Sequence, residues 1–304
     1  MSERTHAGFA VRTPFERRYV KDLAASAHPD AVRAFNATPP VRRKYFAGAR
    51  GLYRPEHHYV VVPPRWERTA EGKVWLGVFA HEIGHAIDMH GRGVAGARSI
   101  ALAPAIRRDR ARLGARIAAE RRLPKRQRGS EGTGGLCRFP AGARAVLLRT
   151  LPHAKAAATF ARAWHDGAPR EALRELAERM TPMEGAGQDP RRSRQTRETA
   201  RLMAYALASV GDFIGAVYDL EGGGRSRGYY NRFPAVSGPS LTVGHTAEAF
   251  ANAFVSDVLE GRELLSYLTR TAAPSTHAAY RNLLADIGRA GAACGQVSRD
   301  FSSR

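Results

Sequence analysis

The chain has little cysteine, little lysine and no long apolar run. Its two cysteines, Cys137 and Cys294, show no CxxC spacing, which argues against a disulfide framework or a cysteine-ligated zinc site and predicts ordinary reduced thiols. No apolar stretch approaches the roughly 18 residues of a membrane helix, and the start of the chain lacks the apolar core of a signal peptide. We therefore expect cytoplasmic synthesis and no membrane partner.

Acidic residues are also scarce relative to basic ones. The chain has 48 lysines and arginines against 28 aspartates and glutamates, a net charge of +20, and such a surface attracts nucleic acid or acidic partners. Most of the basic residues are arginine, a bias that a GC-rich genome produces together with abundant alanine and glycine. Runs such as RRDRAR and KRQR include few aromatics that could stack on bases. Nonspecific nucleic-acid binding through the basic surface stays a hypothesis.

The motif HEIGH occupies residues 81–85. A helix is predicted from about Lys73 to His90, and on it His81 and His85 lie one turn apart, so both imidazoles can bind one zinc ion with Glu82 beside it as general base. The rest of this helix is apolar nearly all round, which predicts burial. A metal would remove the cost of burying these polar groups unpaired.

A second helix is expected to provide the third protein ligand that zinc requires. The HEXXHXXGXXH extension is absent, because Gly91 and Arg92 occupy the place where its third histidine would lie. The best candidate is Glu248 in GHTAEAFANAFVSDVLEG, residues 244–261. Glu221, Glu260 and Glu263 compete for this role, but each lies beside a loop.

Supporting residues are predicted around these ligands. Asn252 shares a helix face with Glu248, and its amide oxygen could accept an N–H from a zinc-bound histidine. Asp88, one turn after His85, could accept the ring N–H of a ligand histidine or an N–H of a neighbouring loop. Thr246 is the expected N-cap of the Glu248 helix.

The remaining segments are consistent with one domain spanning residues 1–304. An N-terminal helical part covers 1–47, with a break near His28-Pro29; 48–93 contains a strand at 58–62 and the motif helix. A basic helical insertion covers 94–200, with helices at about 98–122 and 155–180 and an exposed loop between them. A further helix is expected from about Arg197 to Leu220, and the part from 201 to 304 contains the third-ligand helix and C-terminal helices.

The residues FAHEIGHAID, followed much later by AEAFANAF, resemble the gluzincin-type zinc peptidases. This group includes the catalytic domain of anthrax lethal factor and metallopeptidase domains of phage head-associated proteins and polymorphic toxins. GLYRPE, residues 51–56, is similar to the segment before the motif helix in the lethal factor type. The resemblance covers roughly residues 48–90 and 205–260. It implies Zn²⁺ held by His81, His85 and Glu248, with Glu82 as the base.

The same resemblance implies a helix-rich α+β protein with a zincin-like metallopeptidase fold. Its expected parts are a short β-sheet, a buried HEXXH helix and a long helical insertion. Zincin folds place an edge strand beside the motif helix to pair with extended substrate, and residues 58–62 could fill that place. His57 and His58, at the start of this strand, are further candidates for metal ligands. Neighbours on a strand point to opposite faces, so at most one of them could face the site.

Two features depart from the lethal factor type. The ligands are 248 − 85 = 163 residues apart, which makes the insertion particular to this chain or its subgroup. The tyrosine expected seven residues before the third ligand is replaced by Leu241. The residue that stabilises the oxyanion is then expected to be His245, or Tyr229 or Tyr230 in GGGRSRGYYNRF. In the phage-type sequences a glycine-rich stretch of this kind lies beside the active site, which favours the tyrosines.

The predicted activity is hydrolysis of peptide bonds in a protein or peptide substrate. Glu82 would take a proton from zinc-bound water and pass it to the leaving amine. The expected contexts are packaging in a virion, or delivery by a specialised secretion route as a toxin. The alternative is a basic structural or DNA-associated phage-particle protein whose zinc site is kept for stability. An intact Glu82 argues against it, because structural zinc sites use four closed ligands and need no base.

Overall fold

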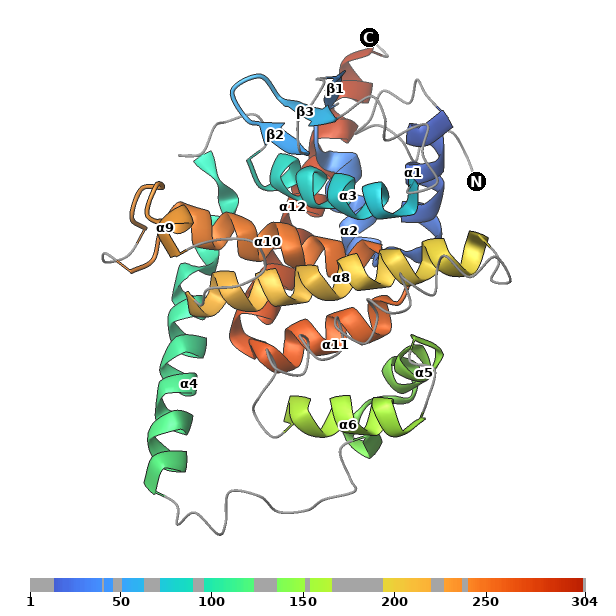
Figure 1. Ribbon diagram of the computed structural model, residues 1–304. Helices are drawn as coiled ribbons and strands as arrows, with labels where there is room; N and C mark the ends of the chain where they lie inside the picture. Colours follow the sequence, from blue (N-terminus) through green and yellow to red (C-terminus); the bar gives the residue numbers. More distant parts are fainter. Residues whose placement is uncertain are drawn as a thin grey trace.

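A small sheet covers one side of a group of helices in the computed structural model (Figure 1). The structure describes residues 14–39, 41–45, 51–62, 72–89, 96–122, 136–150, 154–165, 194–219, 227–236 and 240–302. Within these residues the protein is helix-rich with one three-stranded sheet, as the sequence predicted. None of the described helices is both long and apolar enough to cross a membrane.

The sheet has the strand order β1-β3-β2. Strand β1 (Arg42–Tyr45) is parallel to β3 (Tyr59–Val62), and β2 (Leu52–Arg54) is antiparallel to it. The strand expected at the sheet edge is therefore the central strand, and β1 and β2 form the edges. The reason is the turn at residues 55–58, which folds β2 back along β3 as a hairpin.

Three helices form the centre of the molecule: α3 (Gly72–Met89), α8 (Arg194–Tyr218) and α10 (Val243–Val258). Helix α10 packs against both α3 and α8, and every one of its residues is buried. Its length is rich in alanine, which lets neighbouring helices approach closely. The helix that carries Glu248 is thus fixed in the core by its surroundings on all sides.

The other helices cover this centre. On one side lie α1 (Pro14–Ser26), α2 (Pro29–Ala37) and the long C-terminal α12 (Pro274–Ser302). Helices α5 (Ala141–Thr150) and α6 (Ala154–His165) lie beyond α11 (Arg262–Ala272). The short elements are α9 (Arg227–Tyr230), η4 (Arg98–Leu102) and η6 (Leu136–Arg138).

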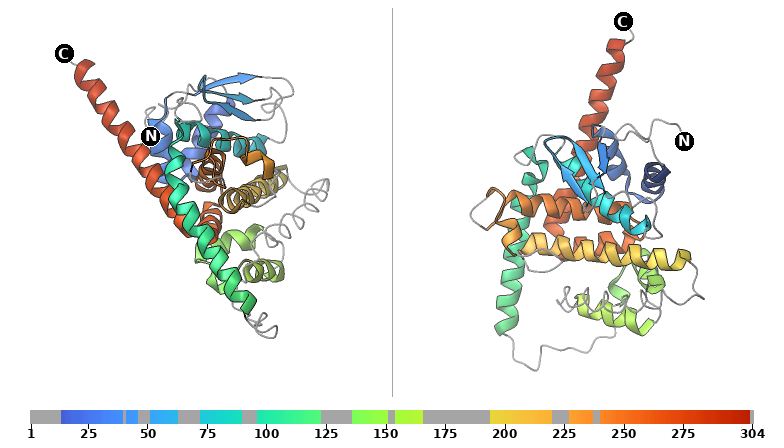
Figure 2. Two further views of the ribbon diagram at one scale, coloured as in Figure 1. Left: turned by 90° about the vertical axis from the view of Figure 1, so that its left-hand side faces the viewer. Right: turned by 45° about the horizontal axis from the view of Figure 1, so that its top comes forward.

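Helix α4 (Ala103–Arg122) begins the segment predicted as an insertion, and its first half is part of the core. Ile106 is fully buried, and Asp109 accepts the backbone N–H groups of Ser275 and Thr276 at the start of α12, at 3.1 and 2.7 Å. Figure 2 shows α4 and α12 side by side along one flank. Asp109 therefore joins the two helices by satisfying N–H groups that the first turn of α12 leaves without intrahelical partners.

Several predicted boundaries agree with the observed elements. The motif helix, expected at 73–90, spans 72–89, and the helix break near His28-Pro29 separates α1 from α2. The loop expected to be exposed from 123 to 142 differs at its end, because Phe139 is buried against Tyr267 with ring centroids 4.7 Å apart. The helix expected at 155–180 is observed as α6, and its part after 165 lies outside the described residues.

Candidate metal centre

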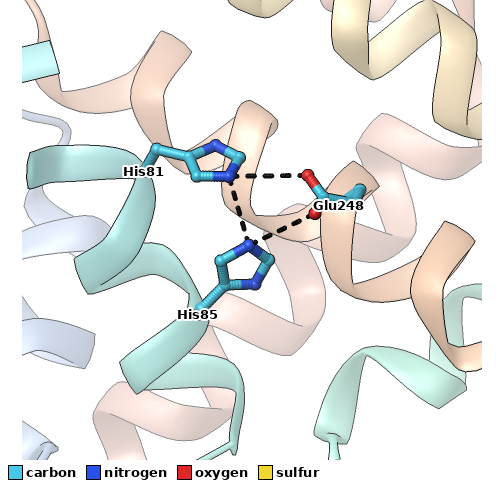
Figure 3. Close-up of side chains that lie close together, drawn as sticks. All are labelled: His81, His85 and Glu248. Atoms are coloured by element: carbon cyan, nitrogen blue, oxygen red, sulfur yellow. Dashed lines mark hydrogen bonds and ion pairs between the residues drawn. The ribbon is translucent and has the colours of Figure 1, made fainter. Parts of the chain in front are cut away.

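Two helices bring three metal-binding side chains together. His81 and His85 lie one turn apart on α3, and Glu248 faces them from α10 (Figure 3). The Nε2 atoms of the histidines are 3.1 Å apart. Glu248 Oε2 lies 3.4 Å from His81 Nε2, and Oε1 lies 3.6 Å from His85 Nε2. His81 and Glu248 are buried, and His85 is partly exposed.

These separations fit a small divalent ion. A tetrahedral zinc ion bonded at about 2.0–2.1 Å holds its ligand atoms about 3.3–3.4 Å from one another. The three observed distances, 3.1, 3.4 and 3.6 Å, lie around this value. Imidazole and carboxylate are also a donor set that zinc accepts. This buried group of two histidines and a glutamate could hold a metal ion.

Asn252 lies one turn after Glu248 on α10 and contacts the side chain of His81. Its Oδ1 lies 3.1 Å from His81 Nδ1, and its Nδ2 donates to the carbonyl of Glu248 at 2.9 Å. An acceptor at Nδ1 places the proton of His81 there and leaves the Nε2 lone pair directed at the site. The contact expected from the spacing of Glu248 and Asn252 is present in the structure. Its effect on a bound metal stays a prediction.

The two helices meet at a glycine inside the motif. A Cβ added to Gly84 would lie 2.8 Å from the Cα of Ala251 on α10, which is closer than side chains approach backbone. Gly84 therefore allows the close contact that brings Glu248 to the two histidines. It is one of the functional residues that the sequence analysis missed.

Glu82 points toward the sheet. Its Oε2 accepts the backbone N–H of Tyr53 at 2.6 Å, and the side chain is buried among α3 and β2. Tyr53 is the middle residue of β2, so the predicted base lies at the edge of the sheet. The phenol of Tyr53 in turn contacts His58 Nδ1 at 2.7 Å, and His58 Nε2 contacts the carbonyl of Pro39 at 2.8 Å.

Of the three candidates for the oxyanion stabiliser, Tyr229 lies at the metal-binding group. Its hydroxyl donates to Glu248 Oε1 at 3.0 Å. Tyr230, the next residue, is buried and stacks on the ring of His245 with centroids 4.1 Å apart. Of the two tyrosines, Tyr229 thus contacts the candidate metal ligands, and Tyr230 packs against His245.

His245 is engaged at the start of α10. Its Nδ1 accepts the backbone N–H of Thr242 at 3.1 Å, and its Nε2 lies 3.3 Å from Asp219 Oδ1. Burial lowers its pKa, partly offset by Asp219. Thr242, and not the expected Thr246, is the N-cap of α10, because the helix begins one turn earlier and His245 completes a capping box.

Asp88 binds the neighbouring short helix η4. It accepts the backbone N–H and the hydroxyl of Ser99 at 2.5 and 2.7 Å. Burial raises the pKa of this carboxyl to about 6, although the hydrogen bonds from Ser99 lower it in part. Asp88 was expected to accept either the ring N–H of a ligand histidine or an N–H of a neighbouring segment. The structure shows its hydrogen bonds to the neighbouring segment, at Ser99.

The other candidate ligands do not join the group. Glu260 and Glu263 are exposed, as is His57, and His58 is engaged with Tyr53 and Pro39 as described. Glu221, Gly91 and Arg92 lie outside the described residues.

No protein-family model matches the chain, and neither the curated proteins nor the solved structures include one that matches it. The resemblance to gluzincins therefore stays a prediction.

Proposed function

We propose that the protein is a zinc-dependent endopeptidase of the gluzincin type with a zincin-like fold. The observation that carries this proposal is the meeting of His81 and His85 with Glu248 at separations that suit a tetrahedral zinc ion. A ligand set of two histidines and one glutamate leaves a coordination position for water or substrate, as catalytic zinc sites do. The glutamate between the two histidines of the motif supplies the base that a structural zinc site would not need.

Glu82 is the general base in this proposal. A bound zinc ion would polarise the scissile carbonyl and lower the pKa of a water molecule toward about 7. Glu82 accepts the proton of the attacking water and returns it to the amine of the departing segment. The N–H of Tyr53, 2.6 Å from Oε2, fixes the carboxylate orientation.

Tyr229 is the donor to the developing oxyanion. Its hydroxyl lies 3.0 Å from a ligand oxygen of Glu248, and a rotation of the side chain would direct it to a substrate carbonyl at the same centre. Such a donor stabilises the charge that forms on the carbonyl oxygen. Thr242 Oγ1 donates to the carbonyl of Tyr230 at 3.0 Å, which holds the short helix α9 against the start of α10.

The test compares the wild type with Glu82→Gln and with Glu263→Gln, an exposed control on α11. All three are purified with zinc, the metal content is measured, and peptide fragments of a denatured protein mixture are sought by mass spectrometry. We expect Glu82→Gln to lose at least about a hundredfold in cleavage rate while it keeps zinc. The control should cleave as the wild type does.

Equal cleavage by Glu82→Gln would refute the proposed mechanism. Absence of cleavage in all three proteins, with zinc bound and DNA retained in a salt-dependent manner, would instead support the alternative of a DNA-associated protein with a stabilising zinc site.

A further inference from the structure

Helix α4 continues beyond the core as a projecting half. Its first half is buried at Ile106 and Asp109, whereas every residue from Ala111 to Arg116 is exposed except Leu113, which is partly buried. A Cβ added to Gly114 would meet no atom within 4 Å. In Figure 1 this half of α4 runs away from α8 and α10. Because a helix exposed nearly all round adds little to the core, packing does not explain this segment.

Exposed arginines follow this part of α4. Arg108, Arg112 and Arg116 lie one turn apart and form a row along the helix, here called the α4 stripe, in which neighbours are separated by about 6 Å along the axis. All three are exposed, as is Arg107. Between Arg107 and Arg116 the sequence contains five arginines and one acidic residue, Asp109. This part of α4 is therefore positively charged, and a polyanion is the partner that its charge fits.

Asp109 balances little of this charge. It is buried and already accepts the backbone N–H groups of Ser275 and Thr276 and the hydroxyl of Thr276 at the start of α12. Arg112 Nη1 lies 3.5 Å from Asp109 Oδ1, yet 61% of the Arg112 side chain is exposed. An ion pair of an exposed arginine at this distance is weak. Arg112 can therefore bind an anion outside the protein without a large loss of stability.

From the projecting half and the α4 stripe we propose that α4 binds double-stranded DNA in the major groove, through the phosphate backbone. An α-helix with its side chains is about 10–12 Å across, and the major groove of B-DNA is about 12 Å wide. Because this half is exposed nearly all round, the walls of the groove can lie on both sides of it. The guanidinium groups bind phosphate oxygens through paired hydrogen bonds. The residues between them, Ala111, Gly114 and Ala115, have no side-chain groups that read base edges, so binding is independent of sequence.

Duplex DNA fits this helix better than the other nucleic acids do. The major groove of duplex RNA is too deep and narrow for side chains to read. Single strands are bound largely by stacking of their bases on aromatic rings, and residues 103–122 include no aromatic residue. The inference goes beyond the proposed function and does not involve the metal centre, so each can fail without the other.

The experiment measures binding to the full chain by fluorescence anisotropy at several salt concentrations. The labelled probes are two short DNA duplexes of unrelated sequence, an RNA duplex and a single DNA strand. In the triple variant Arg108→Gln, Arg112→Gln, Arg116→Gln, the affinity for both DNA duplexes should fall at least about tenfold, and the slope of log K against log salt concentration should become shallower by about three.

The matched control removes three exposed cations from the sheet, with Arg42→Gln, Lys44→Gln and Arg54→Gln. It loses the same net charge and should change the affinity by less than about threefold. Thermal unfolding of the wild type and both triple variants verifies that all three proteins are folded.

Equal losses of affinity in the two triple variants would overturn the inference, because binding would then follow the total charge of the protein. An RNA duplex or a single strand that binds as tightly as duplex DNA would also overturn it. So would polyglutamate that displaces the labelled DNA as effectively as unlabelled duplex DNA does, since α4 would then be a surface for acidic polypeptides.

Discussion

Helix α10 contributes to two polar clusters that differ in how their charge is balanced. One is the metal centre around Glu248. The other, here called the arginine cluster, consists of Asp257, Asp30, Arg281 and His28. Arg281 donates to Asp257 at 2.5 Å and to Asp30 at 2.7 Å, and Ser266 donates to Asp257 at 2.9 Å. The cluster joins α2, α10 and α12.

The difference indicates which cluster could hold an added metal ion. The arginine cluster contains its own cation, so the buried carboxylate of Asp257 is compensated within the protein. The metal centre combines a buried carboxylate with two imidazoles whose Nε2 atoms lie 3.1 Å apart, and none of its three side chains carries a permanent positive charge. Its charge balance therefore depends on protonation of the histidines or on an added ion.

Removing the built-in cation should give the largest change in stability. In Arg281→Met, the buried Asp257 would lose its cationic partner while Asp30 keeps Arg33, and we expect the free energy of unfolding to fall by about 3 kcal/mol. Urea unfolding measures this. The matched control is Arg289→Met, on the same helix but exposed, which should change stability by less than about 0.5 kcal/mol. An equal effect of the two variants would remove the contrast between the clusters.

Adding zinc should stabilise the protein through the group of His81, His85 and Glu248. Zinc that binds only the folded chain at a hundred times its dissociation constant raises the free energy of unfolding by about 2.7 kcal/mol. We expect this gain in the wild type and in Glu260→Gln, and its loss in Glu248→Gln. Chelation should reverse the gain. Thermal unfolding with and without zinc is the measurement, and an undiminished shift in Glu248→Gln would place the third ligand elsewhere.

The smallest expected effect is a pH dependence beside the arginine cluster. Burial lowers the pKa of His277, one turn before Arg281, from 6.5 to about 4, and Asp257 only partly opposes this. The folded state thus binds fewer protons than the unfolded state between these values. Stability from the neutral imidazole is complete above pH 6.5 and is lost as the pH falls toward 4.

This loss can be isolated by comparing slopes. In His277→Gln the loss of unfolding free energy between pH 7 and pH 4 should be smaller than in the wild type. His57→Gln, at an exposed histidine, is the control and should keep the wild-type slope. Identical slopes in all three proteins would show that His277 titrates normally.

The residues that could be predicted from sequence are those whose role follows from local spacing. His81 and His85 share a helix face by their four-residue separation, and the helix around Glu248 is marked by its apolar period. The helix-rich character with a small sheet was implied by the resemblance to gluzincin-type peptidases. The same spacing placed Asn252 beside Glu248, where its amide reaches His81.

Other features depend on contacts that one-dimensional patterns do not contain. The bond to Glu82 comes from the backbone of Tyr53, which any residue could supply. The strand composition identified β3 but could not show that β2 would cover its edge. The N-cap was misplaced because His245 occupies the capping-box position where glutamate or glutamine is the usual signal. The contact of Gly84 with Ala251 joins residues distant in sequence, and only the small size of both residues hints at it.

The contact between Gly84 and Ala251 also has a consequence for the order of events in folding. Glu248 reaches the histidines through this helix pair, which closes a chain separation of 163 residues, and closure of so long a loop is entropically costly and slow. The two histidines alone form a local pair that exists as soon as α3 does. High-affinity metal uptake would therefore follow the docking of α10, so the rate of zinc capture during refolding would report the final assembly of the core.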